Sequence, residues 1–291
     1  MPPVPSISVV IATRDDPGKF APRLRALLRQ IAECEGELVV VSCADRLSPG
    51  VPPCVRVHHL PGATVFDCRA AAFSIARADI VALTEDHCVH APDWCARIIR
   101  GFTLRPDLVL LGGAVANGSP ERLADRMNYW MTFATFAPGQ VTARQPCIAQ
   151  YAVRRSALAG APAAGQLERS LIATLVKVPG AVHVDPQLVV RHEQSHGVWK
   201  TFAVHFHNGR STAGLARAGN GHLGLRDAIG LCSSNAFAHL QRTRAAFVAG
   251  RLSFPLRAAH VAMVLPLLAC HAVGEFVGFR RGPGSSAHRL I

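Results

Sequence analysis

The chain has 291 residues, of which 49% are hydrophobic, and a formal net charge of +12. This composition supports one large folded domain, or a domain with an appendage, and argues against a disordered chain. Nine cysteines without a C-x-x-C pair, and a start without a basic and apolar leader, predict reduced thiols in the cytosol. They argue against a disulfide framework or a structural zinc site.

Strands and helices alternate along the first hundred residues. Apolar runs at residues 6–12, 37–42 and 80–84 predict buried strands. Residues 55–59 are expected to form a further strand, which Pro61-Gly62 ends. Apolar residues at helical spacing predict a helix over 24–31, and Asp67 is expected to cap a helix over 68–77. This alternation predicts an α/β fold with a mostly parallel, Rossmann-type sheet flanked by helices.

The pattern is less regular after residue 102. Further strands and helices are expected at 108–115, 120–136, 148–153, 167–176, 181–190 and 195–216. The last of these segments is predicted to be a long helix. It carries His205, His207 and Arg210, which form either a phosphate-binding face or a solvated one.

The C-terminal region differs in composition from the rest. Residues 258–274 contain no Arg, Lys, Asp or Glu, and this length is at the lower edge of the ~17–25 residues that span a membrane. Two histidines and a proline interrupt the run, so an interfacial helix, or a buried helix of the globular domain, fits as well as a span. We therefore expect an α/β domain over 1–218 and a basic, apolar helical region over 219–291.

The positive charge is concentrated in the same region. From Arg191 onward, the sequence has 12 Arg and Lys residues against 3 acids. Such an excess predicts an anionic partner, and we expect an anionic membrane surface and a cytoplasmic, membrane-associated protein. Aromatic residues make up 6% of the chain and are not interleaved with the basic ones, which argues against nucleic acid.

The most informative segment follows the strand predicted at 80–84. Glu85, Asp86 and His87 come directly after it, at an edge of the sheet where open α/β folds bind ligands. Carboxylates and a neutral imidazole can hold a divalent cation, and the cation can hold a diphosphate. A solvated acidic turn is the alternative. The cation-binding interpretation predicts a nucleotide-dependent transferase.

Other candidate residues follow the remaining strands. Thr13 and Arg14, after the first strand, lie where a nucleotide base or ribose can bind, or they form a capping loop for the next helix. Asp45, after the second strand, has the same two interpretations. Arg69, in the first turn of its helix, either pairs with a phosphate or is exposed.

Two later residues are also candidates. Glu168 lies beside a predicted helix, after a loop rich in Gly, Pro and Ala; alone, one glutamate is weak support for catalysis. His192 follows the apolar strand that ends at residue 190. A lone histidine there is a metal ligand or, more often, structural.

Three segments resemble family 2 of the nucleotide-sugar glycosyltransferases, which have the GT-A fold. Residues 7–16 (I-S-V-V-I-A-T-R-D-D) are similar to the first strand and nucleotide loop of that family. Residues 68–88 are similar to its Arg-bearing helix and D-x-D motif. In this chain, Glu85 and His87 occupy the positions of the two aspartates of that motif. Residues 148–158 resemble the strand that precedes the catalytic carboxylate.

The resemblance covers residues 6–192 and implies roles for the candidates. Glu168 corresponds to the general base. A divalent cation, Mn²⁺ or Mg²⁺, is expected to be held by Asp86, His87 and His192. Donor-binding residues implied by the resemblance are Thr13, Arg14, Asp45, Arg69, Glu85 and Asp86.

The resemblance implies an inverting glycosyltransferase that moves a sugar from a nucleotide-diphosphate donor to an acceptor hydroxyl. The basic, apolar C-terminal region suggests an acceptor that is lipid-linked or close to a membrane. One alternative is a sugar nucleotidyltransferase, although the usual Gly-rich loop with a following Lys is absent after the first strand. Another is a non-enzymatic binding module recruited to a membrane.

Overall fold

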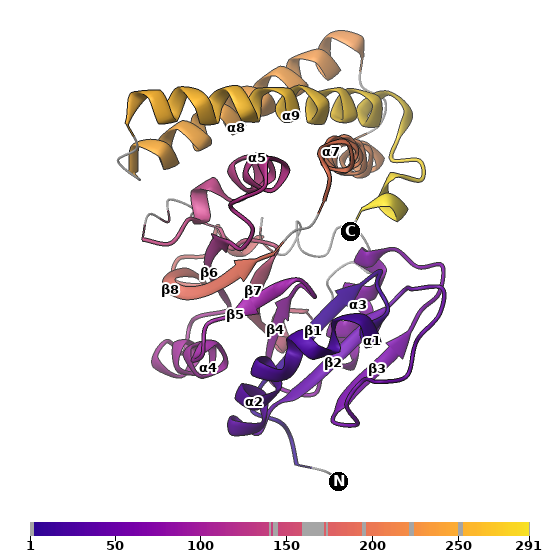
Figure 1. Cartoon of the computed structure of the whole chain (residues 1–291), viewed down its shortest axis with the longest axis vertical. Coiled ribbons are helices and arrows are strands. Elements are labelled where there is room, and N and C mark those ends of the chain that lie inside the picture. The colour runs from indigo at the N-terminus through magenta and orange to yellow at the C-terminus, as the bar shows by residue number, and fades with distance from the viewer. Residues whose placement is uncertain are drawn as a thin grey trace. The chain divides into compact units, whose positions relative to one another are not determined.

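A computed structural model describes residues 3–139, 141, 145–158, 172, 174–193, 196–220, 224–249 and 253–290 (Figure 1). Contacts group the chain into two compact units. The first comprises Met1–Ala116 and Ala143–Glu193, and the second comprises Asn117–Thr142 and Gln194–Ile291. The second unit therefore contains residues 117–142 and 194–218 in addition to the region 219–291 that was expected to be helical.

The first unit is built on an eight-stranded sheet with the order β3-β2-β1-β4-β7-β6-β8-β5. Its strands are β1 (Ser8–Thr13), β2 (Glu37–Ser42), β3 (Val55–His59), β4 (Ile80–Thr84), β5 (Cys88–His90), β6 (Leu110–Asn117), β7 (Gln150–Arg154) and β8 (Val182–His192). The strands β3, β2, β1 and β4 run parallel, whereas β7 pairs antiparallel with β4 and with β6, and β5 with β8.

The prediction of a mostly parallel sheet is therefore corrected, since the sheet is mixed. An apolar run shows that a strand is buried on both faces, and this is common in parallel sheets. It does not fix the direction of the strand, because β4 and β7 are both buried and yet antiparallel. The first four strands have the parallel course that the sequence predicts.

Helices of the first unit lie between its strands. They are α1 (Pro17–Phe20), α2 (Arg25–Glu33), α3 (Val65–Ile75) and α4 (Trp94–Leu104), with short 3-10 turns η1 (Ala21–Leu24) and η3 (Arg155–Leu158). Of these helices, α3 connects the parallel strands β3 and β4. The helix α3 begins earlier than expected because Thr64, not Asp67, is its N-cap. The Thr64 side chain accepts from the Asp67 backbone N–H, and the Asp67 carboxylate accepts from the Thr64 backbone N–H, which is a capping box.

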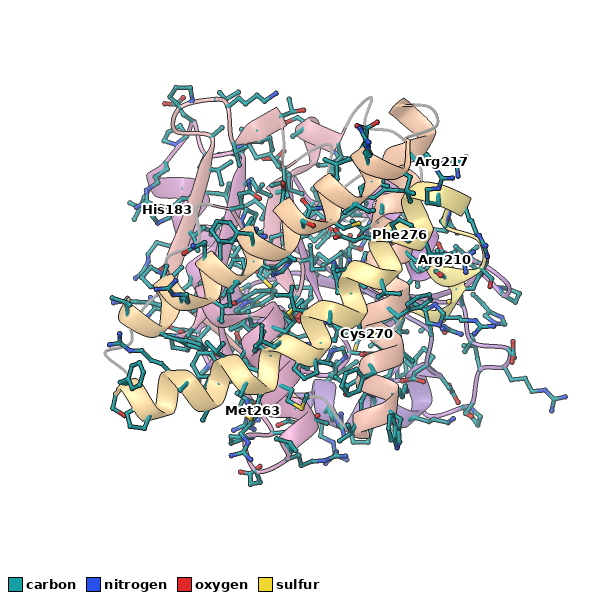
Figure 2. The ribbon with its side chains drawn as sticks, turned by 90° about the horizontal axis from the view of Figure 1, so that it is seen from above. His183, Arg210, Arg217, Met263, Cys270 and Phe276 are labelled. Atoms are coloured by element: carbon teal, nitrogen blue, oxygen red, sulfur yellow. The ribbon has the colours of Figure 1, made fainter. Side chains whose placement is uncertain are left out.

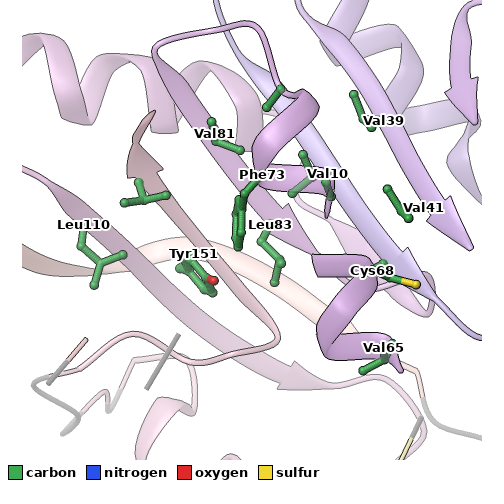
Figure 3. Packing of buried hydrophobic residues seen from close by; sticks show 14 of the residues in the cluster. Val10, Val39, Val41, Val65, Cys68, Phe73, Val81, Leu83, Leu110 and Tyr151 are labelled. Carbon is green, nitrogen blue, oxygen red and sulfur yellow. The ribbon is translucent and has the colours of Figure 1, made fainter. Parts of the chain in front are cut away.

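One hydrophobic cluster of the first unit lies between α3 and the sheet (Figure 3). Phe73 of α3 packs toward Tyr151 of β7, with their ring centroids 6.2 Å apart. Val10, Leu83 and Tyr151 are essentially inaccessible to solvent, and burial of an aliphatic side chain such as Val10 or Leu83 contributes ~1.5–3 kcal/mol. This packing fixes the ends of β1 and β4, and the candidate site residues follow those ends.

One glycine marks a close approach between strands. A Cβ atom on Gly113 of β6 would lie 2.1 Å from the Leu188 carbonyl oxygen of β8. No residue with a side chain fits there without separating the two strands. This contact explains Gly113, and a Cβ atom on the preceding Gly112 would lie 2.6 Å from the Cβ atom of Pro146.

The second unit is helical in its described part. It contains α5 (Leu123–Thr132), α7 (Val198–Asn220), α8 (Leu225–Ala249) and α9 (Phe254–Arg281), with short 3-10 turns η2 (Ala134–Phe136) and η4 (Ser286–Arg289). A cluster of buried side chains joins α5 to α9, and its members are Met127, Met131, Val264, Leu267 and Leu268. The helices α7 and α9 approach closely at Gly274, where a Cβ atom would lie 2.1 Å from the Phe206 carbonyl oxygen.

Candidate functional site

Strand pairing brings the distant parts of the site together. Glu85, Asp86 and His87 follow β4 directly, and the chain then enters β5. The antiparallel register of β5 and β8 places Cys88 opposite His192. The Glu193 backbone N–H donates to the His87 carbonyl oxygen at 2.9 Å, and this hydrogen bond continues the pairing. The side chain of His192 therefore lies beside that of His87.

Glu85, His87 and His192 form a compact group of possible metal ligands, with one ligand atom from each within 4.8 Å of the others. The Nε2 atoms of His87 and His192 are 2.8 Å apart. The Glu85 Oε2 atom lies 3.3 Å from His87 Nε2 and 3.2 Å from His192 Nε2. Metal bonds of ~2.0–2.2 Å to nitrogen and oxygen place neighbouring ligand atoms roughly 3 Å apart. The spacing of this triangle therefore fits one cation.

Asp86 orients this group without belonging to it. Its Oδ1 atom lies 2.6 Å from His87 Nδ1, and its Oδ2 atom accepts a hydrogen bond from the Thr13 hydroxyl. A carboxylate that holds the far nitrogen of a ligating histidine fixes the ring and makes it a better ligand. The structure thus places the Asp86 carboxylate against the far nitrogen of His87, and it groups Glu85, which was also expected near the cation, with the two histidines.

Arg69 fixes the remaining oxygen of Glu85. Its guanidinium lies 3.0 Å from Glu85 Oε1, and the residue is only 5% exposed. Glu85 therefore uses Oε1 for the arginine and Oε2 for the two histidines. Of the two interpretations of Arg69, the exposed one is excluded, and a buried cation stands beside the possible metal group.

The electrostatics of the group favour a shared positive charge. Burial would raise the pKa of Glu85, but hydrogen bonds and charge from His192 and His87 outweigh it and hold the pKa well below 4.5. Burial would lower the pKa of His87, yet the Asp86 and Glu85 carboxylates raise it to about 10. Burial lowers the pKa of His192, and charge on His87 lowers it further. A proton or a cation can occupy the triangle, and these carboxylates stabilise either.

The other candidate residues lie at the same edge of the sheet or outside the described residues. Arg14 and Asp45 are exposed in the loops after β1 and β2. Because β1 pairs parallel with both β2 and β4, these loops leave the sheet at the same edge as Glu85. The Ser42 hydroxyl donates to the Asp15 carbonyl oxygen at 2.9 Å and joins the two loops. Glu168 lies outside the residues that the structure describes.

Gln150 supports the site and was not identified from the sequence. It lies opposite Thr84 in the pairing of β4 with β7 and is fully buried. Its Oε1 atom accepts from the Trp94 indole at 2.7 Å, and its Nε2 atom donates to the Leu188 carbonyl oxygen at 3.1 Å. A buried amide needs hydrogen-bond partners. A glutamine in an otherwise apolar strand therefore indicates a structural role, and this signal could have identified Gln150.

No protein-family model and no curated protein sequence matches the chain. Among solved structures, it is similar to the mannosyltransferase PcManGT from Pyrobaculum calidifontis, in complex with GDP-Man and Mn²⁺, with a TM-score of 0.51 and 17% identity over 95% of this chain and 86% of that one. This likeness shows a shared fold, and it supports the GT-A-like fold expected from residues 7–158.

Two further structures are more distant. A mycobacterial protein is 16% identical over 68% of this chain and 70% of that one, with a TM-score of 0.47. Mannosyl-3-phosphoglycerate synthase from Rubrobacter xylanophilus is 18% identical over 66% and 68%, with a TM-score of 0.43.

Proposed function

We propose that the chain is an inverting glycosyltransferase that moves a sugar from a nucleotide-diphosphate donor to an acceptor hydroxyl. The group of Glu85, His87 and His192, at the edge where β1, β2 and β4 end, is the observation that carries this proposal. Ligands of open α/β sheets bind at this edge. The mannosyltransferase of similar fold, whose structure holds GDP-Man and Mn²⁺, gives the proposal a precedent.

The ligand atoms of the group suggest which cation it holds. Two imidazole nitrogens and one carboxylate oxygen suit transition metals, whereas Mg²⁺ prefers oxygen ligands only. Of the two expected cations, Mn²⁺ therefore fits better than Mg²⁺. When bound, the cation offsets the negative charge on the leaving diphosphate. Asp86 keeps the His87 ring in position for this task.

The remaining candidates would bind the donor and remove the acceptor proton. The buried guanidinium of Arg69 adds positive charge beside Glu85. The loops that carry Arg14 and Asp45 leave the same edge of the sheet and would hold the nucleoside. Glu168 would take the proton of the acceptor hydroxyl while the oxygen bonds to the anomeric carbon and the nucleotide diphosphate leaves.

The acceptor would be lipid-linked or close to a membrane, with an anionic membrane surface as the partner of a cytoplasmic enzyme. Among the described helices, one segment, Arg257–Arg281, is long and apolar enough to cross a membrane by length and composition. The excess of basic residues after Arg191 adds attraction for anionic lipid headgroups.

A ligand panel tests the donor site directly. UDP, GDP, dTDP and CMP are added to the protein with and without Mn²⁺, and the unfolding temperature is measured. We expect one nucleoside diphosphate to raise it only when Mn²⁺ is present, because a ligand that binds the native state stabilises it. The His192→Ala variant should lose this increase, while His288→Ala, at an exposed histidine, should retain it. An absence of any nucleotide effect with metal present would reject the proposal.

Catalysis by Glu168 needs a separate measurement. With the donor identified by the panel, Glu168→Gln should lower turnover by a factor of ~10²–10⁴ and leave donor binding nearly unchanged. Turnover close to that of the wild type would remove Glu168 from the proposal and leave the metal group in place.

A further inference from the structure

The exposed face of α9 is apolar over most of its length. Phe254 is 82% exposed, Leu265 is 46% exposed and Val273 is 56% exposed. The α9 stripe, as we call this face, consists of the exposed residues Phe254, Pro255, Ala258, Ala259, Ala262, Leu265, Pro266, Ala269 and Val273. Their spacing of three or four residues keeps them on one side of the helix, and the stripe is ~29 Å long.

The opposite face of α9 is bound into the second unit. Figure 2 shows α9 beside α8, with Met263, Cys270 and Phe276 labelled along α9. The Asn235 side chain of α8 donates to Glu275 at 2.9 Å, and Glu275 is buried. The Cys270 thiol donates to the Phe202 carbonyl oxygen of α7. The α9 stripe is therefore the side of a helix that is already packed.

Basic residues lie near both ends of this apolar stripe. Arg257 lies near its beginning, and the exposed Arg280 and Arg281 lie beyond its end. From Gln194 to Ile291, the sequence has eleven Lys and Arg residues and two acids, Asp227 and Glu275. Since Glu275 is buried and bonded to Asn235, Asp227 is the acid of this region that is exposed.

We propose that the α9 stripe lies flat in the interface of an anionic bilayer, with its apolar side chains at the level of the acyl chains and its arginines among the headgroups. This inference rests on the membrane partner proposed above and specifies the surface and its orientation. A helix with one apolar face and flanking basic residues binds a membrane in this way.

A membrane-spanning orientation conflicts with the partners of α9. The helices α7 and α8 carry charged residues along their lengths, including Arg210, Arg226 and Arg242, and charged side chains are expensive inside the hydrocarbon. The α9 helix could span a membrane only if it separated from α7 and α8. That would break the Asn235–Glu275 hydrogen bond and the contact at Gly274, and would carry Glu275 into the hydrocarbon.

A second copy of the chain is a poorer occupant of the stripe than lipid. In a two-fold dimer, the same face meets itself. Antiparallel stripes would then place Arg257 of one copy near Arg280 and Arg281 of the other, and these like charges repel each other. Anionic headgroups match this charge at both ends of the stripe.

Vesicle flotation tests the surface. The full chain is mixed with phosphatidylcholine vesicles, with or without phosphatidylglycerol, and the floated fraction is measured. We expect binding to the anionic vesicles, and a loss of about 10-fold or more in partitioning for Leu265→Glu, because a charge replaces a side chain that enters the acyl region. The matched control is Leu104→Glu, at a residue of α4 that is 72% exposed, and it should bind as the wild type does. Equal binding by both variants would overturn the proposal.

Quenching by brominated lipids tests the orientation. Tryptophan is introduced singly at Ala258, Leu265 and Val273, and the wild-type signal is subtracted. A helix lying flat predicts similar, shallow quenching at all three positions. Deepest quenching at Leu265, with shallow values at the other two, would show a spanning helix and reject the inference.

Two controls separate this inference from the donor site. Mn²⁺ binding should be the same for Leu265→Glu and the wild type, because the metal group is formed by residues of the first unit. Loss of vesicle binding with intact Mn²⁺ binding therefore concerns the α9 stripe alone. Sedimentation without lipid detects self-association, and a dimer that Leu265→Glu dissociates, without vesicle binding by the wild type, would contradict the inference.

Discussion

His87 and His192 are separated by 105 positions in the chain, and their Nε2 atoms lie 2.8 Å apart. The pairing of β5 with β8 holds them there, because Cys88 lies opposite His192 in the register. A slip of one residue would turn the His192 side chain to the other face of the sheet. The candidate metal site therefore depends on one strand register.

The role of Asp86 leads to a prediction about metal affinity. Asp86→Asn should weaken Mn²⁺ binding by ~10–100-fold, because the residue that orients a ligating histidine contributes about this much. His192→Ala, which removes a ligand atom, should weaken it further. Titration calorimetry with Mn²⁺ measures both. Asp107→Asn, at an exposed aspartate, is the control, and equal affinity for Asp86→Asn and this control would contradict the orienting role.

The close approach of β6 and β8 leads to a prediction about stability. Gly113→Ala should lower the free energy of unfolding by ~3 kcal/mol or more, because its Cβ would lie 2.1 Å from a backbone oxygen. At Gly101 of α4, an added Cβ would meet only the end of the Leu111 side chain at 2.9 Å, and alanine favours helices. Urea denaturation should therefore show little change or a gain for Gly101→Ala, and similar losses in the two variants would refute the argument.

Glu37 leads to a prediction about acid stability. Its carboxylate accepts hydrogen bonds from Ser8, Arg56 and Arg77. Burial would raise the pKa of Glu37, but these bonds outweigh it and lower the pKa below 4.5. The unfolded chain then binds the proton more readily, so this stabilisation is present above pH 4.5 and is lost as the pH falls.

Glu37→Gln should therefore cost about 2 kcal/mol near neutral pH. The stabilities of variant and wild type should converge as the pH falls below 4.5. Urea denaturation at pH 7 and at pH 3.5 checks this. If the difference in unfolding free energy between variant and wild type is the same at both pH values, the charge of Glu37 does not contribute to stability.

His205 predicts a second pH dependence, in the helical unit. It donates to Asn128 at 2.9 Å. Burial, followed by charge on His271 and His239, lowers the pKa of His205 from 6.5 to about 3. The unfolded chain is protonated first, so stability is lost as the pH falls below 6.5. At pH 5 the loss from this residue is about 2 kcal/mol.

His205→Gln keeps a donor for Asn128 and does not titrate. It should show a smaller loss of stability between pH 7 and pH 5 than the wild type, whereas His288→Ala, at an exposed histidine, should show the same loss. Thermal unfolding at the two pH values measures these differences. An unchanged loss in His205→Gln would mean that other groups cause it.

The sequence predicted the positions of several strands better than their directions. The apolar runs at 37–42 and 80–84 coincide with β2 and β4, because a continuous apolar run has few uses other than a buried strand. The strand expected at 55–59 coincides with β3. The antiparallel course of β7 depends on contacts between distant segments, which a local pattern does not contain. The earlier start of α3 is a local effect that was missed, since Thr64 and Asp67 cap it together.

The site shows the same distinction between residue type and arrangement. Acids and histidines after a strand marked Glu85, His87 and His192 as candidates from chemistry and resemblance. Whether Asp86 binds a metal or orients His87 depends on side-chain directions, and the sequence holds no information on those. Gln150 was missed because its three partners lie on other elements.

The packing of α5 has a consequence for how the protein is made. Met127 and Met131 of α5 pack against Leu267 and Leu268 of α9, which is the last long helix of the chain. During synthesis, the apolar side of α5 leaves the ribosome well before that partner exists. Deleting α9 would leave the newly made α5 uncovered. We therefore expect the truncated chain to bind chaperones and to aggregate, whereas chains with single surface substitutions should not.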